Sequence, residues 1–521
     1  MKRIIALLMT VILLSAVCCV TVYADSAEPP YEAPEDKVEP AATGFAADNL
    51  PAGADGTMQV PRIDIITENG NGASLEKADG YVNAQITVTD TDGSALNGDV
   101  SFKVRGNSTA LSFVQKKSFT FKFAKKTEVL GMGKGKKWAM LANCFDPTLL
   151  RNYSVFEFAR ELGLPYTSEQ RFVELWLDGN YHGCYIVCEP VQEGKDRVDI
   201  DIESNDGKKD FLLEYEASRV EDDVTYLTAG GLRFAMSDPE EPTEEQLAYI
   251  TGVMNDIVNT LKAGAEEEIR RKIDVDSFAK LYLLNEYAKT ADFGFSSVFF
   301  FYKDGVLYAG PAWDYDLSLG NLNSDLNSAV AKAAAKSDGI LQSDKNFYRY
   351  LTDKDWFNTE IKRVYAEHYD YIENISADGG VLDSYREQYN DVFTRNFTVW
   401  RVNKWWLNYQ KQPLATYEEN YQLLKSWCAG RNTWLTDYYG LSRYSFLRGD
   451  ADGNGILEIT DATKIQRVLA DLEEDSDGKI AIRAAFSDDT LNIYDATTIQ
   501  RYIAMMDVPY ELNEQTSVIL Y

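Results

Sequence analysis

The stretch from residue 285 to residue 323 constrains the fold most, because it places acidic residues at both ends of one predicted β-hairpin. A run of β-branched and aromatic residues predicts a strand over Val298–Lys303, and a Lys-Asp-Gly turn leads into a second short strand. Asp292 precedes this hairpin, and the pair Asp314 and Asp316 follows it. We expect the three carboxylates to converge on one pocket. The alternative is a loop whose Asp side chains only cap backbone amides.

Carboxylates that converge in this way suit phosphoryl transfer to a hydroxyl. That reaction uses one carboxylate to orient or deprotonate the acceptor and another to hold Mg²⁺ against the phosphates. Phosphoryl transfer is therefore our first functional hypothesis, although acidic pairs are also common in loops that have no catalytic role.

Four separated segments resemble one protein family. The segment after the hairpin reads G-P-A-W-D-Y-D-L-S-L-G-N (310–321). Upstream, K-V-R-G-N-S-T (103–109) is followed by K-K-S-F-T-F-K-F (116–123). The other two segments are W-A-M-L-A-N-C-F-D-P-T-L-L-R-N (138–152) and R-F-V-E-L-W-L-D-G-N-Y-H-G-C-Y-I-V-C-E-P-V (171–191). Over about residues 60–440 the chain thus resembles the spore coat protein H (CotH) family of atypical protein kinases.

The resemblance implies an α+β fold over residues 59–443, two-lobed like an atypical protein kinase. The N-terminal lobe would be β-rich and the C-terminal lobe helical. It also implies that Asp292 is the catalytic carboxylate, that Asp314 is a metal ligand assisted by Asp316, and that ATP binds with Mg²⁺ or Mn²⁺. Ordinary kinases place a metal-binding Asn five residues after the catalytic Asp, and this chain has Ser297 there.

Two cationic residues are candidates for binding the phosphates. Lys117 opens the predicted strand after the R-G-N-S-T turn, and ordinary kinases use a strand lysine for this purpose. Arg105 is the other candidate, because a guanidinium grips phosphate oxygens with two hydrogen bonds. For each, the alternative is an edge-strand charge that keeps the sheet soluble. The run around Glu189 would be the connection between the lobes, where a kinase-like fold contacts adenine.

A different module begins near residue 446. Residues 450–461, D-A-D-G-N-G-I-L-E-I-T-D, have the ligand spacing of a calcium loop. The predicted ligands are Asp450, Asp452, Asn454, the carbonyl of Ile456, Glu458 and Asp461. The following helix, D-A-T-K-I-Q-R-V-L-A (461–470), recurs as D-A-T-T-I-Q-R-Y-I-A (495–504). This duplicated loop and helix resembles a type I dockerin (446–506), a small all-α module that binds cohesin modules of a cellulosome scaffoldin.

The second loop of this module departs from the calcium pattern. Ala484 and Phe486 occupy its first two ligand positions, and Ser487 or Asp489 would have to compensate in a shifted register. The remaining candidate ligands are Asp488, Asn492 and Asp495. We expect Ca²⁺ at the first loop and leave the second loop open.

The resemblance to dockerins places the cohesin contacts at the start of each repeated helix and along it. These residues are Ile459, Thr460, Lys464 and Arg467 in the first helix, and Ile493, Tyr494, Thr498 and Arg501 in the second. Apolar side chains at an exposed helix start are suitable interface anchors. Residues 507–521 would form a C-terminal tail.

The first 24 residues predict a secretory signal, with Lys2-Arg3 before an apolar run and a small-residue cleavage site that ends at Ala24. The competing interpretation is a retained membrane anchor, but the apolar run is short. Residues 25–58, rich in Pro, Ala, Glu and Gly, predict a disordered linker. We expect a secreted protein, with no membrane span after signal removal, in an extracellular or cell-surface cellulosome.

Charge and rare residues exclude several classes of site. The net charge of −30 argues against nucleic acid and anionic membranes as partners. Two histidines in the whole chain make a His-based metal site or catalytic dyad implausible. We expect the four cysteines that follow the signal to be buried thiols rather than a disulfide framework. They are Cys144, Cys184, Cys188 and Cys428.

Our main hypothesis is an exported kinase that phosphorylates Ser or Thr of an extracellular protein, whose identity the sequence does not reveal. Two other functions are also compatible with the sequence. The chain could be a non-catalytic cellulosomal component that binds protein or plant cell-wall polysaccharide, or it could be a glycoside hydrolase. Several tryptophans in the helical region 325–440 would allow a polysaccharide platform, but core packing is the commoner use of such residues. No carboxylate pair lies in a recognisable hydrolase motif.

Overall fold

The structure is a computed structural model that describes residues 58–221, 224–488 and 490–521. The predicted signal (1–24) and the predicted linker, except for its last residue, lie outside the described residues. The chain divides into two compact units, the first ending at Leu435 and the second beginning at Thr436.

The first unit opens with a closed β-barrel whose strand order is β1-β2-β3-β4-β5-β7-β6. Alternation predicts that Phe119, Phe121 and Phe123 share one face, and all three lie in the barrel core. A parallel pairing of β1 with β6 closes the barrel. The strands are β1 Arg62–Thr67, β2 Val82–Thr89, β3 Ala95–Arg105, β4 Ser118–Glu128, β5 Lys134–Leu141, β6 Gln170–Leu177 and β7 Asn180–Cys188.

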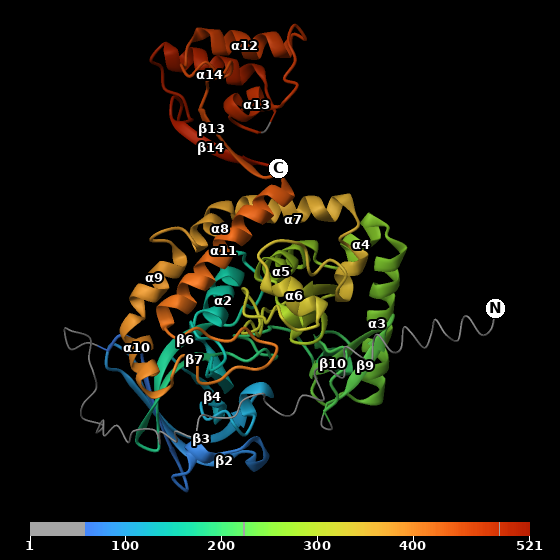
Figure 1. Ribbon diagram of the computed structural model, residues 1–521. Helices are drawn as coiled ribbons and strands as arrows, with labels where there is room; N and C mark the ends of the chain where they lie inside the picture. The colour runs from blue at the N-terminus through green and yellow to red at the C-terminus, as the bar shows by residue number, and fades with distance from the viewer. Residues whose placement is uncertain (1–57, 222–223, 489) are drawn as a thin grey trace. The chain divides into compact units, whose positions relative to one another are not determined.

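A five-stranded sheet of order β12-β11-β8-β10-β9 follows the barrel in the chain. Its β11–β12 hairpin is the one predicted from the sequence, and β11 also pairs with the central strand β8. Helix α3 (Glu244–Ala263) lies alongside β9 and β10 (Figure 1). The strands are β8 Phe211–Tyr215, β9 Tyr226–Ala229, β10 Leu232–Asp238, β11 Val298–Lys303 and β12 Val306–Ala309.

Helices dominate the rest of the first unit. Helix α5 (Val275–Ala288) is buried along almost its whole length, because its apolar residues are not confined to one stripe. The β-rich start and the helical C-terminal part agree with the predicted α+β class. The other helices are α2 Arg151–Glu161, α4 Glu266–Lys272, α6 Ala329–Ala335, α7 Asp355–Glu367, α8 Tyr369–Ile375, α9 Val381–Gln388, α10 Asn390–Val399 and α11 Tyr417–Tyr439.

The second unit has its own apolar core, which includes Ala462, Ile465, Ala496 and Ile499 from the two repeated helices. The repeats form α12 (Ile459–Leu469) and α14 (Ile493–Ile503), and α13 (Lys479–Ala484) lies between them in the chain. Within the module predicted over residues 446–506, the described elements are these helices and the end of a strand that begins before it. Within the predicted tail, β14 (Gln515–Leu520) pairs antiparallel with β13 (Ser442–Leu447), because both segments carry β-branched or aromatic residues that favour a ladder.

Several side chains lie where the sequence predicts. All four described cysteines are free thiols; Cys144 is partly buried and the other three are buried, which confirms the prediction. Trp400 and Trp405 pack in a buried cluster, as expected for core residues. Among the described residues, no helix is both long and apolar enough to cross a membrane.

Candidate active site and candidate calcium loop

A cavity of about 1030 Å³ in the first unit gathers most of the predicted kinase residues. Its lining comes from the loop after β3, from residues 190–191 after β7 and from residues 406–409. It also comes from β8, from the 3₁₀ turn Ala291–Gly294 and from the loop after β12. Asp292, Asp314 and Asp316 all line the cavity, so the two ends of the hairpin do converge.

The three aspartates share a poorly solvated space. Burial and the charge of Asp314 raise the pKa of Asp292 to about 7. Burial also raises the pKa of Asp314, although a hydrogen bond from Ser297 and the charge of Arg105 oppose that shift. The pKa of Asp316 lies well above its usual range, because the group is buried and both other aspartates repel its charge. Crowded carboxylates of this kind are common where a cation or a proton is handled.

Ser297 connects two of the acidic groups. Its Oγ donates to Asp314 Oδ2 at 3.3 Å, and its backbone N–H donates to Glu214 Oε1 at 2.9 Å. Ser297 and Asp314 both have left-handed backbone, with φ of +61° and +65°. Non-glycine residues adopt this conformation at a cost that surrounding contacts must offset, and such residues cluster at functional sites.

Helix α2 holds the loop that carries Asp314 and Asp316. Asn152 Oδ1 accepts a hydrogen bond from the N–H of Tyr315 at 2.7 Å, between the two aspartates. Asn152 Nδ2 donates to Asn143 Oδ1 at 3.1 Å. The neighbouring Arg151 is buried, pairs with Asp146 at 2.5 Å and donates to the carbonyl of Ser318 at 3.2 Å. Buried hydrogen bonds from α2 therefore fix the backbone of the loop that carries the predicted metal ligands Asp314 and Asp316.

Of the two residues predicted to bind phosphate, Arg105 lines the cavity. Its guanidinium lies 5.3 Å from the ring centre of Trp313. Trp313, Phe299 and Val191 line the same cavity and pack in one apolar cluster. The cavity thus offers an apolar wall of the kind that binds a planar base, together with charged groups.

Lys117 and Glu189 do not line the cavity. Lys117 is buried and pairs with Glu76, so it is held away from any phosphate in the cavity. Glu189 lies 3.6 Å from Arg197 Nε and accepts from the N–H of Glu169 at 3.2 Å. Burial raises the pKa of Glu189 to about 7. The structure therefore does not bring these two residues together with the aspartates.

The cavity is also lined by three charged residues that were not predicted from the sequence, Glu214, Glu216 and Arg219. Burial raises the pKa of Glu214 to about 7. The signal was an acidic residue inside an otherwise apolar strand, Phe-Leu-Leu-Glu-Tyr, because a buried charge in such a strand requires a partner or a function. No motif marks Arg219.

The first loop of the second unit brings predicted calcium ligands together. Asp450, Asp452 and Asp461 are the only group of three acidic side chains, in the described ranges, whose ligand atoms all lie within 4.8 Å of one another. Asp450 accepts hydrogen bonds from the N–H groups of Gly453, Asn454 and Gly455, which fixes the loop around it. Three carboxylates on a preformed loop suit Ca²⁺.

The second loop repeats backbone contacts of the first, but Ala484 and Phe486 stand where the first loop has Asp450 and Asp452. Asp495 accepts from the N–H groups of Phe486 at 3.1 Å and Asn492 at 2.8 Å, and Asp461 makes the same two contacts at the same distances with Asp452 and Glu458. The side chain of Phe486, however, is buried, with the ring of Tyr510 5.5 Å away and the guanidinium of Arg448 5.3 Å away. The residue at this predicted ligand position therefore packs in the apolar core of the unit.

The other predicted ligands of the second loop also have local partners. Asp488 accepts from the N–H of Thr490 at 3.1 Å, and Asn492 caps helix α14 by accepting from the N–H of Tyr494 at 2.9 Å. Asp489 lies outside the described residues. In the first loop, Asn454 and Glu458 are exposed, and Asn454 Nδ2 donates to Glu458 Oε1 at 3.5 Å. The side chain of Ile456 is exposed as well.

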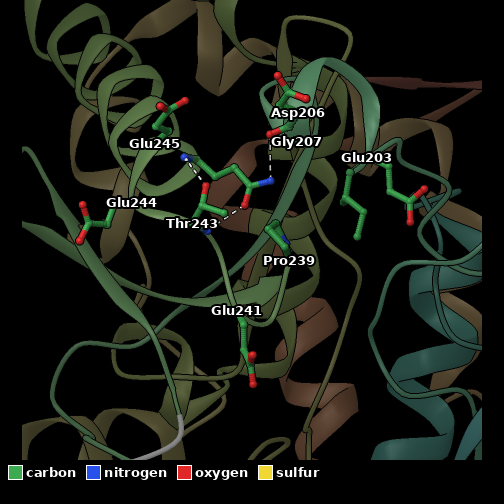
Figure 2. A pocket seen from close by; sticks show the side chains of 10 residues that line it. Glu203, Asp206, Gly207, Pro239, Glu241, Thr243, Glu244 and Glu245 are labelled. Carbon is green, nitrogen blue, oxygen red and sulfur yellow. Dashed lines mark hydrogen bonds between the residues drawn. The ribbon is translucent and has the colours of Figure 1, made fainter.

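A second cavity of about 740 Å³ contains none of the predicted site residues. Figure 2 shows the acidic side chains Glu203, Glu241, Glu244 and Glu245 around it, at the start of α3. Thr243 caps this helix, since its Oγ1 accepts from the N–H of Gln246 at 3.2 Å. The cavity is a solvated acidic hollow beside a helix cap, and we assign it no function.

Comparison with known proteins agrees with the geometry of the first unit. Residues 102–435 match the family described as CotH kinase protein, and this match covers more than half of the chain. It includes Arg105, the β11–β12 hairpin and the three aspartates of the cavity. No curated protein matches the chain. The chain belongs to the CotH kinase family.

Proposed function

We propose that the first unit is an ATP-dependent protein kinase that transfers phosphate to Ser or Thr of an extracellular protein. The observation that carries this proposal is the convergence of Asp292, Asp314 and Asp316 on one cavity that Arg105 also lines, within the part of the chain that matches the family. These groups are the kinds that phosphoryl transfer requires.

The residues fit a metal–nucleotide complex. Mg²⁺ is commonly held by one or two carboxylates together with substrate phosphates, and Asp314 and Asp316 supply two carboxylates from one loop. Mg²⁺ or Mn²⁺ bound there would neutralise phosphate charge. Arg105 would grip the phosphates, and the wall of Val191, Phe299 and Trp313 would cover the base.

Asp292 is the group that would receive the acceptor proton. Burial holds its pKa at about 7, so it accepts a proton at neutral pH more readily than an ordinary aspartate does. It lies on the 3₁₀ turn Ala291–Gly294, which the N–H of Ala291 anchors to the carbonyl of Leu317 at 3.0 Å. That contact ties the turn to the loop of Asp314 and Asp316.

The test is transfer of label from γ-labelled ATP in the presence of Mn²⁺ or Mg²⁺, with a generic acceptor protein and the chain itself as substrates. Asp292→Asn and Asp314→Asn should each reduce transfer about 100-fold or more. Asp304→Asn is the matched control, because Asp304 is an exposed aspartate in the turn of the same hairpin and does not line the cavity. Transfer that survives both cavity substitutions would defeat the assignment.

We propose in addition that the second unit is a calcium-dependent docking module of the dockerin kind, which attaches a secreted kinase to a cohesin of a scaffoldin. Two observations support it: the preformed group of Asp450, Asp452 and Asp461, and the exposed apolar side chains Ile459 and Tyr494 at the starts of the repeated helices. The test is binding of the full chain to a panel of cohesins with Ca²⁺ and with EDTA. Binding that ignores EDTA, or no binding to any cohesin, would contradict this proposal.

A further inference from the structure

Two cationic side chains line the active-site cavity, in the part of the chain that the structure describes: Arg105 at the end of β3 and Arg219 after β8. Five carboxylates line the same cavity, from Asp292, Asp314, Asp316, Glu214 and Glu216. A triphosphate brings further negative charge into this space. The two arginines are therefore the side chains available to bind phosphate oxygens directly.

Arg219 is held loosely. Its Nη2 lies 3.3 Å from Glu216 Oε2 and its Nη1 lies 3.8 Å from Glu221 Oε1, whereas charge-assisted hydrogen bonds are about 2.7–2.9 Å long. The side chain is 42% exposed. Arg151, by contrast, is buried and bonded to a carboxylate and to backbone carbonyls, as a structural arginine is. The Arg219 guanidinium can change partners when an anion enters the cavity.

The position of Arg219 also separates its role from that of Arg105. Arg219 reaches the cavity from the segment after β8, whereas Arg105 reaches it from the end of the barrel strand β3. The Arg105 guanidinium lies 5.3 Å from the ring centre of Trp313, which belongs to the apolar wall proposed to cover the base. Arg105 is therefore the arginine beside the base wall, and Arg219 is the one paired with acidic side chains.

We propose that Arg219 binds the phosphoryl group while it is being transferred, and that Arg105 holds the phosphates that do not react. The inference rests on the proposed kinase function. In the step, a bond forms between the acceptor oxygen and the γ-phosphorus as the bond from that phosphorus to the β,γ-bridging oxygen breaks. The acceptor proton goes to Asp292, and ADP leaves. Arg219 is not consumed. Its planar guanidinium group neutralises negative charge on the oxygens of the phosphoryl group during transfer.

The experiment compares Arg219→Gln with Arg233→Gln in the full chain. Arg233 Nη1 donates to the carbonyl of Arg219 at 2.8 Å, and Arg233 does not line the cavity. This control therefore removes a hydrogen bond to the Arg219 backbone and leaves the Arg219 guanidinium in the cavity. We expect Arg219→Gln to lower kcat at least about 100-fold, because an arginine that stabilises the transferred group contributes chiefly to the transition state. The affinity for Mg·AMP-PNP should stay within about threefold, since ground-state binding is retained.

A readout specific to the guanidinium completes the test. Added guanidinium ion should restore part of the activity of Arg219→Ala but none of that of Asp292→Asn, because only the first variant lacks a cation. A kcat within threefold of the wild type in Arg219→Gln, or an equal loss in Arg233→Gln, would overturn the inference while leaving the kinase proposal intact. An inactive wild-type chain that still binds Mg·AMP-PNP would overturn both.

Discussion

His182 is a buried histidine in the wall of the barrel, surrounded by the rings of Phe119, Tyr185 and Trp400. Burial and the nearby charge of Lys116 lower its pKa to about 3. Below about pH 6.5 the unfolded state takes up a proton at His182, whereas the folded state does so only near pH 3. The free energy of unfolding therefore has its full value from this group above about pH 6.5 and falls as the pH drops towards 3.

His182→Leu should therefore make the protein less sensitive to acid. Between pH 7 and pH 5 the wild type should lose about 2 kcal/mol more free energy of unfolding than this variant, at about 1.4 kcal/mol for each pH unit below the unfolded pKa. Denaturant titrations at the two pH values measure the difference. Parallel losses in the two proteins would show that His182 is not held neutral.

Asn152 is a positioning residue for the loop of Asp314 and Asp316. In Asn152→Leu, the N–H of Tyr315 loses its partner in a buried place, which costs about 1–3 kcal/mol of unfolding free energy. Phosphoryl transfer should fall as well, and the apparent affinity for Mn²⁺ should weaken, because the two carboxylates lose their support. Asn390→Leu is the control, since that side chain is exposed and should change stability by less than about 0.5 kcal/mol. Normal affinity for Mn²⁺ in Asn152→Leu would contradict this role.

The two repeated loops of the second unit differ in the carboxylates that they bring together. Asp461 and Asp495 make equivalent backbone contacts, but of the two only Asp461 belongs to a group of three carboxylates among the described residues. The chain should bind Ca²⁺ at one loop of this unit. Asp461→Asn should weaken that affinity at least about 100-fold, more than the loss of an outer-shell partner does.

Asp495→Asn, which removes the same charge from the second loop, should leave Ca²⁺ affinity within about threefold. Isothermal titration of both variants measures this pair. Two calcium ions bound in the second unit of the wild type, or equal losses in the two variants, would refute the idea that the second loop, with Phe486 at a ligand position, does not bind calcium.

Periodicity and turn chemistry in the sequence predicted the elements well. The β11–β12 hairpin, the phenylalanine face of β4 and the duplicated helices follow from local patterns. Contacts between distant segments could not be predicted. Lys117 pairs with Glu76, and Arg219 reaches the cavity of Asp292, through the packing of separate elements that carry no shared motif. The strand β14 was missed for the same reason, since its partner β13 lies about 70 residues earlier in the chain.

At the scale of the whole molecule, each unit has a core of its own. Calorimetry should therefore resolve two unfolding transitions. EDTA should lower the Tm of the transition that belongs to residues 436–521 and leave the other in place, because a ligand stabilises only the unit that binds it. Asp461→Asn identifies that transition independently. A single transition, or two that shift equally with EDTA, would contradict the separate stability of the units.

We propose that the cavity of the first unit binds a metal–nucleotide complex through Asp314, Asp316 and Arg105. The most direct test is a crystal structure of the chain with Mn²⁺ and AMP-PNP, in which anomalous scattering locates the metal. We expect Mn²⁺ to be bound by the carboxylate of Asp314, with Asp316 beside it and the triphosphate along Arg105. Nucleotide outside this cavity, or manganese found only in the loop of residues 450–461, would contradict it.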